Sequence, residues 1–159
     1  MTFRYLGAVW TLRMLVALLG GAAVATPALA GLGGSASSVA ADIAALHGQV
    51  QSTGFVQYDQ HQITTRMGVV NEYVTRDGQV FAITWQGFIP PNLQQLLGGY
   101  FGRLQAAAAA QGHRPGMHRY FSLVQSDLVV VNMGRMRSFR GIAYLPALVP
   151  AGVSVGELP

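Results

Sequence analysis

The stretch from Gly68 to Leu104 reads GVVNEYVTRDGQVFAITWQGFIPPNLQQLLGGYFGRL and decides the fold. Two runs rich in β-branched and aromatic residues, 69–75 and 79–85, stand on either side of Asp77-Gly78, which is the strongest short-range signal for a β-hairpin. Pro90-Pro91 stops the second strand, because proline has no N–H to donate to a neighbouring strand. The sequence therefore predicts a hairpin that is followed at once by a different element.

That element is a helix, which we expect to begin at Asn92, whose side chain can cap the first turn, and to end at Gly112. Its apolar residues recur at helical spacing and form one continuous stripe, as in a helix that packs on a core. Gly98-Gly99 lies in the middle and predicts either a bend or a close approach to the sheet. The stripe comprises Leu93, Leu96, Leu97, Tyr100, Phe101, Leu104, Ala107 and Ala108.

The hairpin has two possible registers. A two-residue turn pairs Glu72 with Ile83, whereas a three-residue loop with a left-handed glycine pairs Asn71 with Ile83. In both registers Phe81, Ile83 and Trp85 share one face, and we expect that face to meet the helix.

The register decides the surroundings of Glu72. In the first register its carboxylate points into the apolar layer, where it needs a partner such as an arginine, or a raised pKa. A structural pair between Glu72 and an arginine is the simpler interpretation. A catalytic carboxylate is the alternative, because perturbed carboxylates also occur in active sites.

Residues 1–30 have the pattern of an export signal. Arg4 and Arg13 precede an apolar run at 14–24, and Ala28 and Ala30 form an A-x-A cleavage site. The apolar run is much shorter than the roughly 20 residues that a membrane-spanning helix needs. We therefore expect cleavage after Ala30, and no transmembrane segment in the mature chain.

The remaining residues are enough for one domain with a sizeable core. The glycine-rich segment 31–36 predicts a flexible lead, and residues 37–159 a single domain. The chain contains no cysteine, which excludes disulfides, thiolate nucleophiles, cysteine-based metal sites and a lipidated cysteine. Packing alone must hold the domain together in a periplasmic or secreted location.

The charge argues against a nucleic-acid partner. All ten basic residues are arginine; two of them lie in the signal, so eight arginines face six acids and the mature chain carries a net charge of +2. Proteins that bind nucleic acid usually present a denser basic face.

The other elements complete an α+β fold with one antiparallel sheet of about five strands packed by two helices. Before the hairpin we expect a helix from Ser37 or Ser38 to Val50, and a strand at 62–67. After the second helix the pattern predicts a basic loop at 113–119, strands at 120–125 and 128–132, a turn at Gly134, a strand at 139–145 and a proline-punctuated tail on the surface.

Three arginines that could bind a ligand are clustered within six residues of the sequence, at Arg135, Arg137 and Arg140. Arginine forks suit carboxylate, phosphate or sulfate groups, so these residues are candidate ligand-binding residues. In one continuous strand Arg135 and Arg137 would share a face and Arg140 would point the opposite way, so a three-arginine site needs an irregular loop. The alternatives are that they pair with Glu72, Asp77 or Asp127, or that they solvate an edge strand.

Enzymatic signatures are missing from the sequence. It has no G-x-S-x-G elbow, no H-E-x-x-H and no Walker loop, which leaves Glu72 and Asp127 as weak candidates for the catalytic carboxylates of a hydrolase. His113 and His118 do not have zinc-ligand spacing, so we expect neither a metal nor a cofactor.

The chain as a whole resembles a family of small exported proteobacterial proteins that is catalogued only as a domain of unknown function. The resemblance implies a location in the envelope of a Gram-negative bacterium, and it implies no activity or catalytic residue. It covers nearly the whole mature chain and rests on residues 72–74, 77–78, 80–87, 91–97, 99–101, 127–130, 136–146 and 150–153.

Two functions follow as hypotheses. The first is a non-enzymatic binding or interaction module of the envelope, which takes an anionic envelope ligand or a protein partner through 135–140 and the exposed hairpin face. The second is a hydrolase that acts on cell-envelope material through Glu72 or Asp127.

Overall fold

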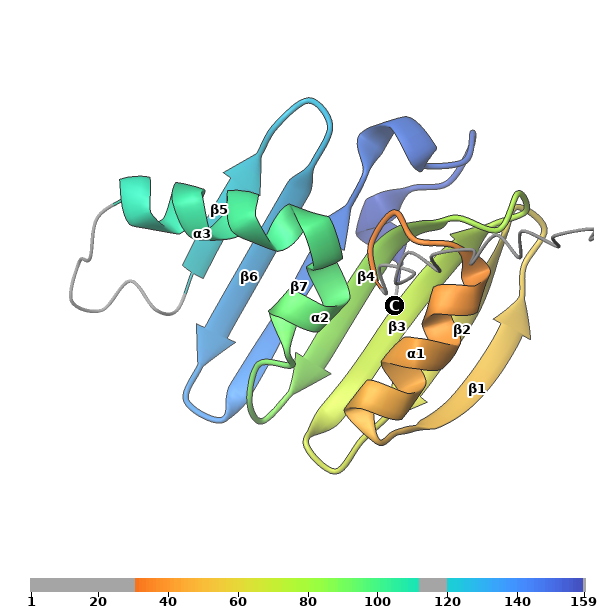
Figure 1. Ribbon diagram of the computed structural model, residues 1–159, viewed down its shortest axis with the longest axis horizontal. Helices are drawn as coiled ribbons and strands as arrows, with labels where there is room; N and C mark the ends of the chain where they lie inside the picture. Colours follow the sequence, from red (N-terminus) through yellow and green to blue (C-terminus); the bar gives the residue numbers. More distant parts are fainter. Residues whose placement is uncertain (1–30, 112–119, 159) are drawn as a thin grey trace, which may run out of the picture.

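The computed structural model describes residues 31–111 and 120–158 (Figure 1). The predicted export signal at 1–30 and the predicted basic loop at 113–119 lie outside the described residues. None of the helices in the described part of the chain is long and apolar enough to cross a membrane.

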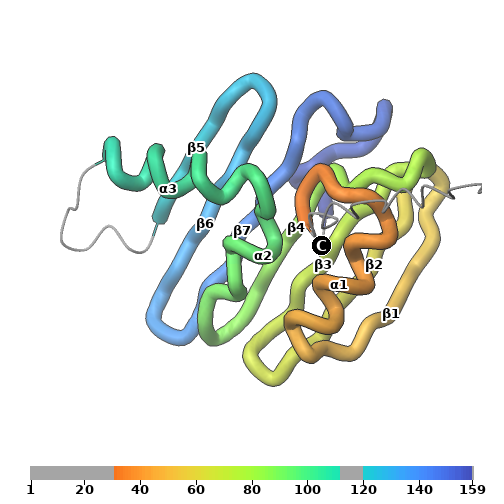
Figure 2. Tube along the Cα trace, in the orientation of Figure 1, coloured from red at the N-terminus to blue at the C-terminus, as the bar shows by residue number. Residues whose placement is uncertain are grey.

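Seven antiparallel strands form one sheet in the order β1-β2-β3-β4-β7-β6-β5, which the tube view traces from one edge to the other (Figure 2). The predicted α+β class with a single antiparallel sheet is confirmed, but the sheet has more strands than the expected five or so. The strands are β1 (Gln49–Gly54), β2 (Tyr58–Thr64), β3 (Gly68–Thr75), β4 (Val80–Gly87), β5 (Tyr120–Val124), β6 (Val129–Arg135) and β7 (Ser138–Tyr144).

Helices cover one face of this sheet (Figure 1). Helix α1 (Ala36–Leu46) ends four residues before the expected Val50, because His47 turns into the left-handed region at φ 50°. The predicted second helix is present as α2 (Leu93–Leu97), a 3-10 turn η1 (Gly98–Tyr100) and α3 (Phe101–Ala110). Asn92 caps α2 as expected, and the glycine pair marks a bend.

The hairpin of β3 and β4 combines both predicted registers. Its loop has three residues, closed by a hydrogen bond from the Thr75 N–H to the Gln79 carbonyl, with Gly78 at φ 79°. A β-bulge then shifts the pairing, so that Glu72 lies opposite Ile83 as in the first register. The bulge also turns Phe81 to the opposite face from Ile83, so the expectation that both side chains meet the helices is wrong for Phe81.

Each face of the sheet has its own core. The main core lies between the sheet and the helices and includes Ile83, Trp85, Leu96 and Leu97. On the opposite face a smaller core of three buried residues (Tyr73, Phe81 and Ala82) lies under the C-terminal tail, which contains the 3-10 turns η3 (Pro146–Leu148) and η4 (Val155–Glu157). The tail covers only part of this face. Farther along it the side chains of Gln86, Met133 and Arg140 are exposed, and we call this part the open face.

The segment expected to be a flexible lead is instead anchored in the fold. The N–H of Leu32 donates to the Leu96 carbonyl at 2.8 Å, and Gly33 and Gly34 exchange backbone hydrogen bonds with Val80. A Cβ on Gly31, which has φ 100°, would lie 2.2 Å from the Leu96 oxygen. Glycine is therefore needed here because it lets the backbone come close to Leu96, and not because it makes the segment flexible.

Candidate functional site

The open face of the sheet, opposite the helices, carries the arginine cluster. On this face Gln86 of β4, Arg140 of β7 and Met133 of β6 lie directly opposite one another across the three strands. Directly paired residues of an antiparallel sheet project their side chains to the same face. The three side chains therefore form one row across the open face.

The β6–β7 hairpin brings the other two arginines to the same region. Arg135 pairs with Ser138, so the turn contains only Met136 and Arg137. The turn thus falls two residues after the expected position at Gly134, which is buried and continues β6. Arg137 takes φ 58°, a left-handed conformation that side-chain-bearing residues rarely adopt.

Because of this turn, the three arginines border two adjoining hollows. Arg135 and Arg140 line a hollow of about 800 Å³ together with Tyr120 and Ser138. Arg137 and Arg140 line a neighbouring hollow of about 880 Å³ that extends toward the C-terminal tail. The rule that Arg135 and Arg140 would point to opposite faces holds for a single strand; here they stand on two strands, and the rule does not apply. We call the two hollows together the arginine groove.

None of the three arginines has an acidic partner among residues 31–111 and 120–158. The two ion pairs found there join Arg76 to Asp59 at 3.0 Å and Arg103 to Asp127 at 2.7 Å. The arginines of the groove are exposed. Pairing with Glu72, Asp77 or Asp127, the alternative that the sequence left open, does not occur in the described structure.

Asp127 lies in the loop before β6, where it is ion-paired with α3. Arg103 donates to both of its carboxylate oxygens, at 2.8 and 2.7 Å, and also to the side chain of Gln125. These hydrogen bonds lower the pKa of Asp127 below its ordinary value. Such a carboxylate stays ionised and fastens the helix to the β5–β6 loop.

Glu72 points into the main core, as the first register predicts, but its neighbour is an acid and not an arginine. Both Glu72 and Asp42 of α1 are completely buried. Gln95 donates from Nε2 to the Asp42 carboxylate at 2.7 Å. Burial and the nearby Asp42 raise the pKa of Glu72 to about 9, so the Glu72 carboxyl holds a proton at neutral pH.

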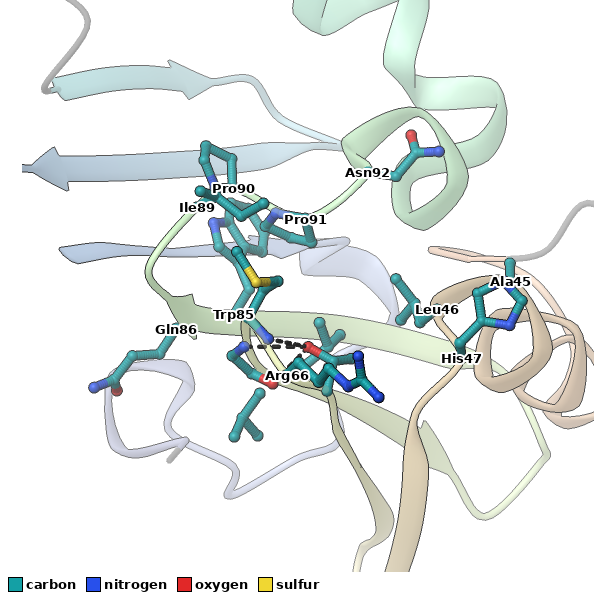
Figure 3. A pocket seen from close by; sticks show the side chains of 15 residues that line it. Ala45, Leu46, His47, Arg66, Trp85, Gln86, Ile89, Pro90, Pro91 and Asn92 are labelled. Carbon is teal, nitrogen blue, oxygen red and sulfur yellow. Dashed lines mark hydrogen bonds between the residues drawn. The ribbon is translucent and has the colours of Figure 1, made fainter. Parts of the chain in front are cut away.

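A separate pocket of about 490 Å³ opens at the end of the sheet, where α1 ends and the chain leaves β4 (Figure 3). Its lining is largely apolar and includes Leu46, Trp85 and Ile89, with His47 and Arg66 as polar members. The hydroxyl of Thr65 accepts the N–H groups of Met67 and Gly68 and thereby fixes the β2–β3 turn at its edge.

The described residues contain no group of three histidine, aspartate or glutamate side chains that could hold a metal ion.

The family model described as "Protein of unknown function (DUF2844)" matches residues 28–158. The chain belongs to this family. No curated protein and no solved structure matches this DUF2844 protein.

Two features of this DUF2844 protein were not predicted from its sequence. Asp42 stands three residues after Val39 and one before Ile43, on the apolar stripe of its helix, which is a sign of burial that the sequence did contain. The pocket of Figure 3 joins segments that lie far apart in the sequence, around His47, Arg66 and Pro90. No local pattern could have brought these segments together.

Proposed function

We propose that this protein is an exported envelope protein that binds an anionic ligand in the arginine groove. The observation that carries the proposal is the placement of Arg135, Arg137 and Arg140 around two adjoining hollows without an acidic partner in the described chain. Guanidinium groups bind carboxylate, phosphate and sulfate through paired N–H donors. Export and the envelope location rest on the A-x-A pattern that ends at Ala30 and on the family resemblance.

The lining of the groove favours a ligand that carries hydroxyl groups as well as charge. Gln86 and Ser138 add neutral hydrogen-bonding groups beside the arginines, and Tyr120 and Met133 add partly exposed apolar surface. An acidic polysaccharide offers carboxylates, hydroxyls and the apolar faces of its sugar rings. We therefore name an acidic envelope polysaccharide as the ligand class.

The backbone at Arg137 also supports a binding role. A non-glycine residue held at φ 58° is strained by roughly 1–2 kcal/mol. Strained residues concentrate at binding and catalytic sites, where the side chain is needed in one position. At this turn a glycine would relieve the strain but would remove a cation from the groove.

A hydrolytic function has no comparable support. Glu72 is completely buried in the main core, and Asp127 is occupied by Arg103. Neither residue lines the arginine groove or the pocket of Figure 3.

The test is thermal unfolding of the chain from Gly31 onward with alginate, a soluble polyuronate, and with uncharged dextran. A ligand that binds only the native state raises Tm by mass action. We expect alginate to raise Tm, less at about 300 mM salt than at about 20 mM because salt screens exposed charges, and dextran to have no effect. The double variant Arg135→Ala with Arg137→Ala should fold and lose the shift; an unchanged shift in this variant contradicts the proposal.

A further inference from the structure

The buried acids in the main core, Asp42 and Glu72, form no ion pair with a basic side chain of the described residues. No N–H or hydroxyl group of the other described residues donates to either oxygen of Glu72 or to Oδ2 of Asp42. The two acids instead share a proton, which Glu72 donates to Asp42. Two acids buried side by side are unfavourable unless a positive group or a shared proton compensates them. One shared proton still leaves a negative charge on the pair once Asp42 ionises, so the pair raises the question of which cation the fold provides.

The elements around the pair supply almost none. Helices α1 and α2 and strands β3 and β4 contain no basic residue. Strand β2 contributes His61, which lies opposite Glu72, but its Nδ1 is hydrogen-bonded to the Ser52 hydroxyl of β1 at 2.7 Å. Arg76, which follows β3, is a cation that is already ion-paired with Asp59 of β2.

The backbone nitrogen of Gly31 lies next to this pair. The Gly31 N–H donates to the Asp42 carboxyl. Its position is fixed independently: Gly31 is buried, the next residue is hydrogen-bonded to Leu96, and Gln95 of the same turn reaches Asp42. A side chain at position 31 would collide with the Leu96 carbonyl, so only glycine brings its nitrogen this close.

Gly31 is also the residue that follows the predicted A-x-A cleavage site at Ala28 and Ala30. Hydrolysis of the Ala30–Gly31 peptide bond consumes one water and leaves a carboxylate on Ala30 and an ammonium group on Gly31. The uncharged amide N–H of Gly31, which donates to Asp42, is thereby replaced by an ammonium group with three N–H donors and a full positive charge.

We infer that removal of the leader completes the core, because the new α-ammonium group of Gly31 forms a buried ion pair with the Asp42 carboxylate, to which Glu72 is hydrogen-bonded. The processed protein is then more stable than the same fold with an amide at position 31. This inference rests on the proposed export and cleavage, and it is independent of the ligand in the arginine groove.

The sequence offers an unusually clean test, since all ten Lys and Arg residues are arginine and the α-amine is the one primary amine of the processed chain. A protein that begins at Gly31, released from a fusion by a protease that leaves no extra residue, is compared with its N-acetylated form. Acetylation keeps an amide N–H at Gly31 and removes only the charge. We expect acetylation to lower Tm by roughly 5 °C or more.

Two variants assign the effect to the acids. In Glu72→Gln combined with Asp42→Asn the difference in Tm between the free and the acetylated form should fall to less than about 2 °C, whereas His61→Gln should keep it. Equal Tm values for the free and acetylated wild type overturn the inference. So does an undiminished difference in the double variant, because the amine then acts elsewhere.

Reactivity of the amine in the wild type provides a second readout that needs no variant. A buried, ion-paired ammonium should react with acetic anhydride at least about tenfold more slowly in the native protein than in the urea-unfolded chain. Equal rates show a solvent-exposed amine and overturn the inference. The mass of the exported protein reports cleavage separately: a first residue other than Gly31 overturns the premise of processing, whatever the result for alginate binding.

Discussion

The buried acid pair predicts a stability that falls as pH rises, and the substitution Glu72→Gln should remove this dependence. The pKa of Glu72 is raised from 4.5 to about 9 by burial and by Asp42. Between these two values the folded protein holds a proton that the unfolded chain has lost. Stability is therefore greatest below the ordinary value and decreases as pH rises toward about 9.

The size of the effect follows from linkage. One proton taken up on folding changes the free energy of unfolding by about 1.4 kcal/mol per pH unit. Between about pH 5 and about pH 7 the protein should thus lose roughly 3 kcal/mol, a large part of the stability of a domain of this size. Burial also raises the pKa of Asp42, so Asp42 contributes a decrease in the same direction.

The assay is urea unfolding at several pH values, with Gly31 acetylated so that position 31 carries an amide, as in the structure. Glu72→Gln is close in shape to a protonated glutamate and should flatten the slope. His61→Gln changes the residue that lies opposite Glu72 on β2, so it serves as the control and should keep the wild-type slope. A wild-type slope near zero, or an equal slope in Glu72→Gln, refutes the reasoning.

Three further substitutions test the local geometry. Gly31→Ala should lower the free energy of unfolding by at least about 1–3 kcal/mol, because the new Cβ collides with Leu96. Gly99 has open space around it, so Gly99→Ala should be neutral or stabilising by up to about 1 kcal/mol. An equal loss of stability in both variants would contradict the packing at Gly31. Arg137→Gly should stabilise the protein by about 0.5–1 kcal/mol while weakening alginate binding, and a loss of stability would show that the turn is not strained. Thr65→Val should cost about 1 kcal/mol in urea unfolding because two N–H groups lose their acceptor, and Thr65→Ser should restore most of it; no loss in the valine variant would contradict the role of the hydroxyl.

The sequence predicted the parts of the fold that local patterns dictate. The Asp77-Gly78 turn, the strands beside it and the stripe that follows Asn92 are encoded in short segments, and each is found in the structure. Strand β1 was missed because every one of its residues is exposed, so it has no alternation between apolar and polar positions. Backbone pairing with β2 holds it in the sheet, and this leaves little trace in the sequence.

The errors at the candidate sites have a common physical cause. The face of Phe81 depended on one bulged residue, and a shift of one residue moves a side chain to the opposite face. The partner of Glu72 depended on where α1 crosses β3. The grouping of Arg135 with Arg140 depended on the position of the turn between β6 and β7. These are relations between segments, which residue spacing within one segment does not determine.

The most direct test of the central claim compares two single substitutions that each remove one positive charge. Arg140 lines both hollows of the arginine groove, and Arg66 lies at the pocket of Figure 3. By calorimetric titration with alginate at low salt, Arg140→Ala should weaken binding by about tenfold or more, the loss expected for one charged hydrogen bond, and Arg66→Ala should leave it within about twofold. Equal losses in the two variants would mean that alginate responds only to net charge, and that the groove is not its binding site.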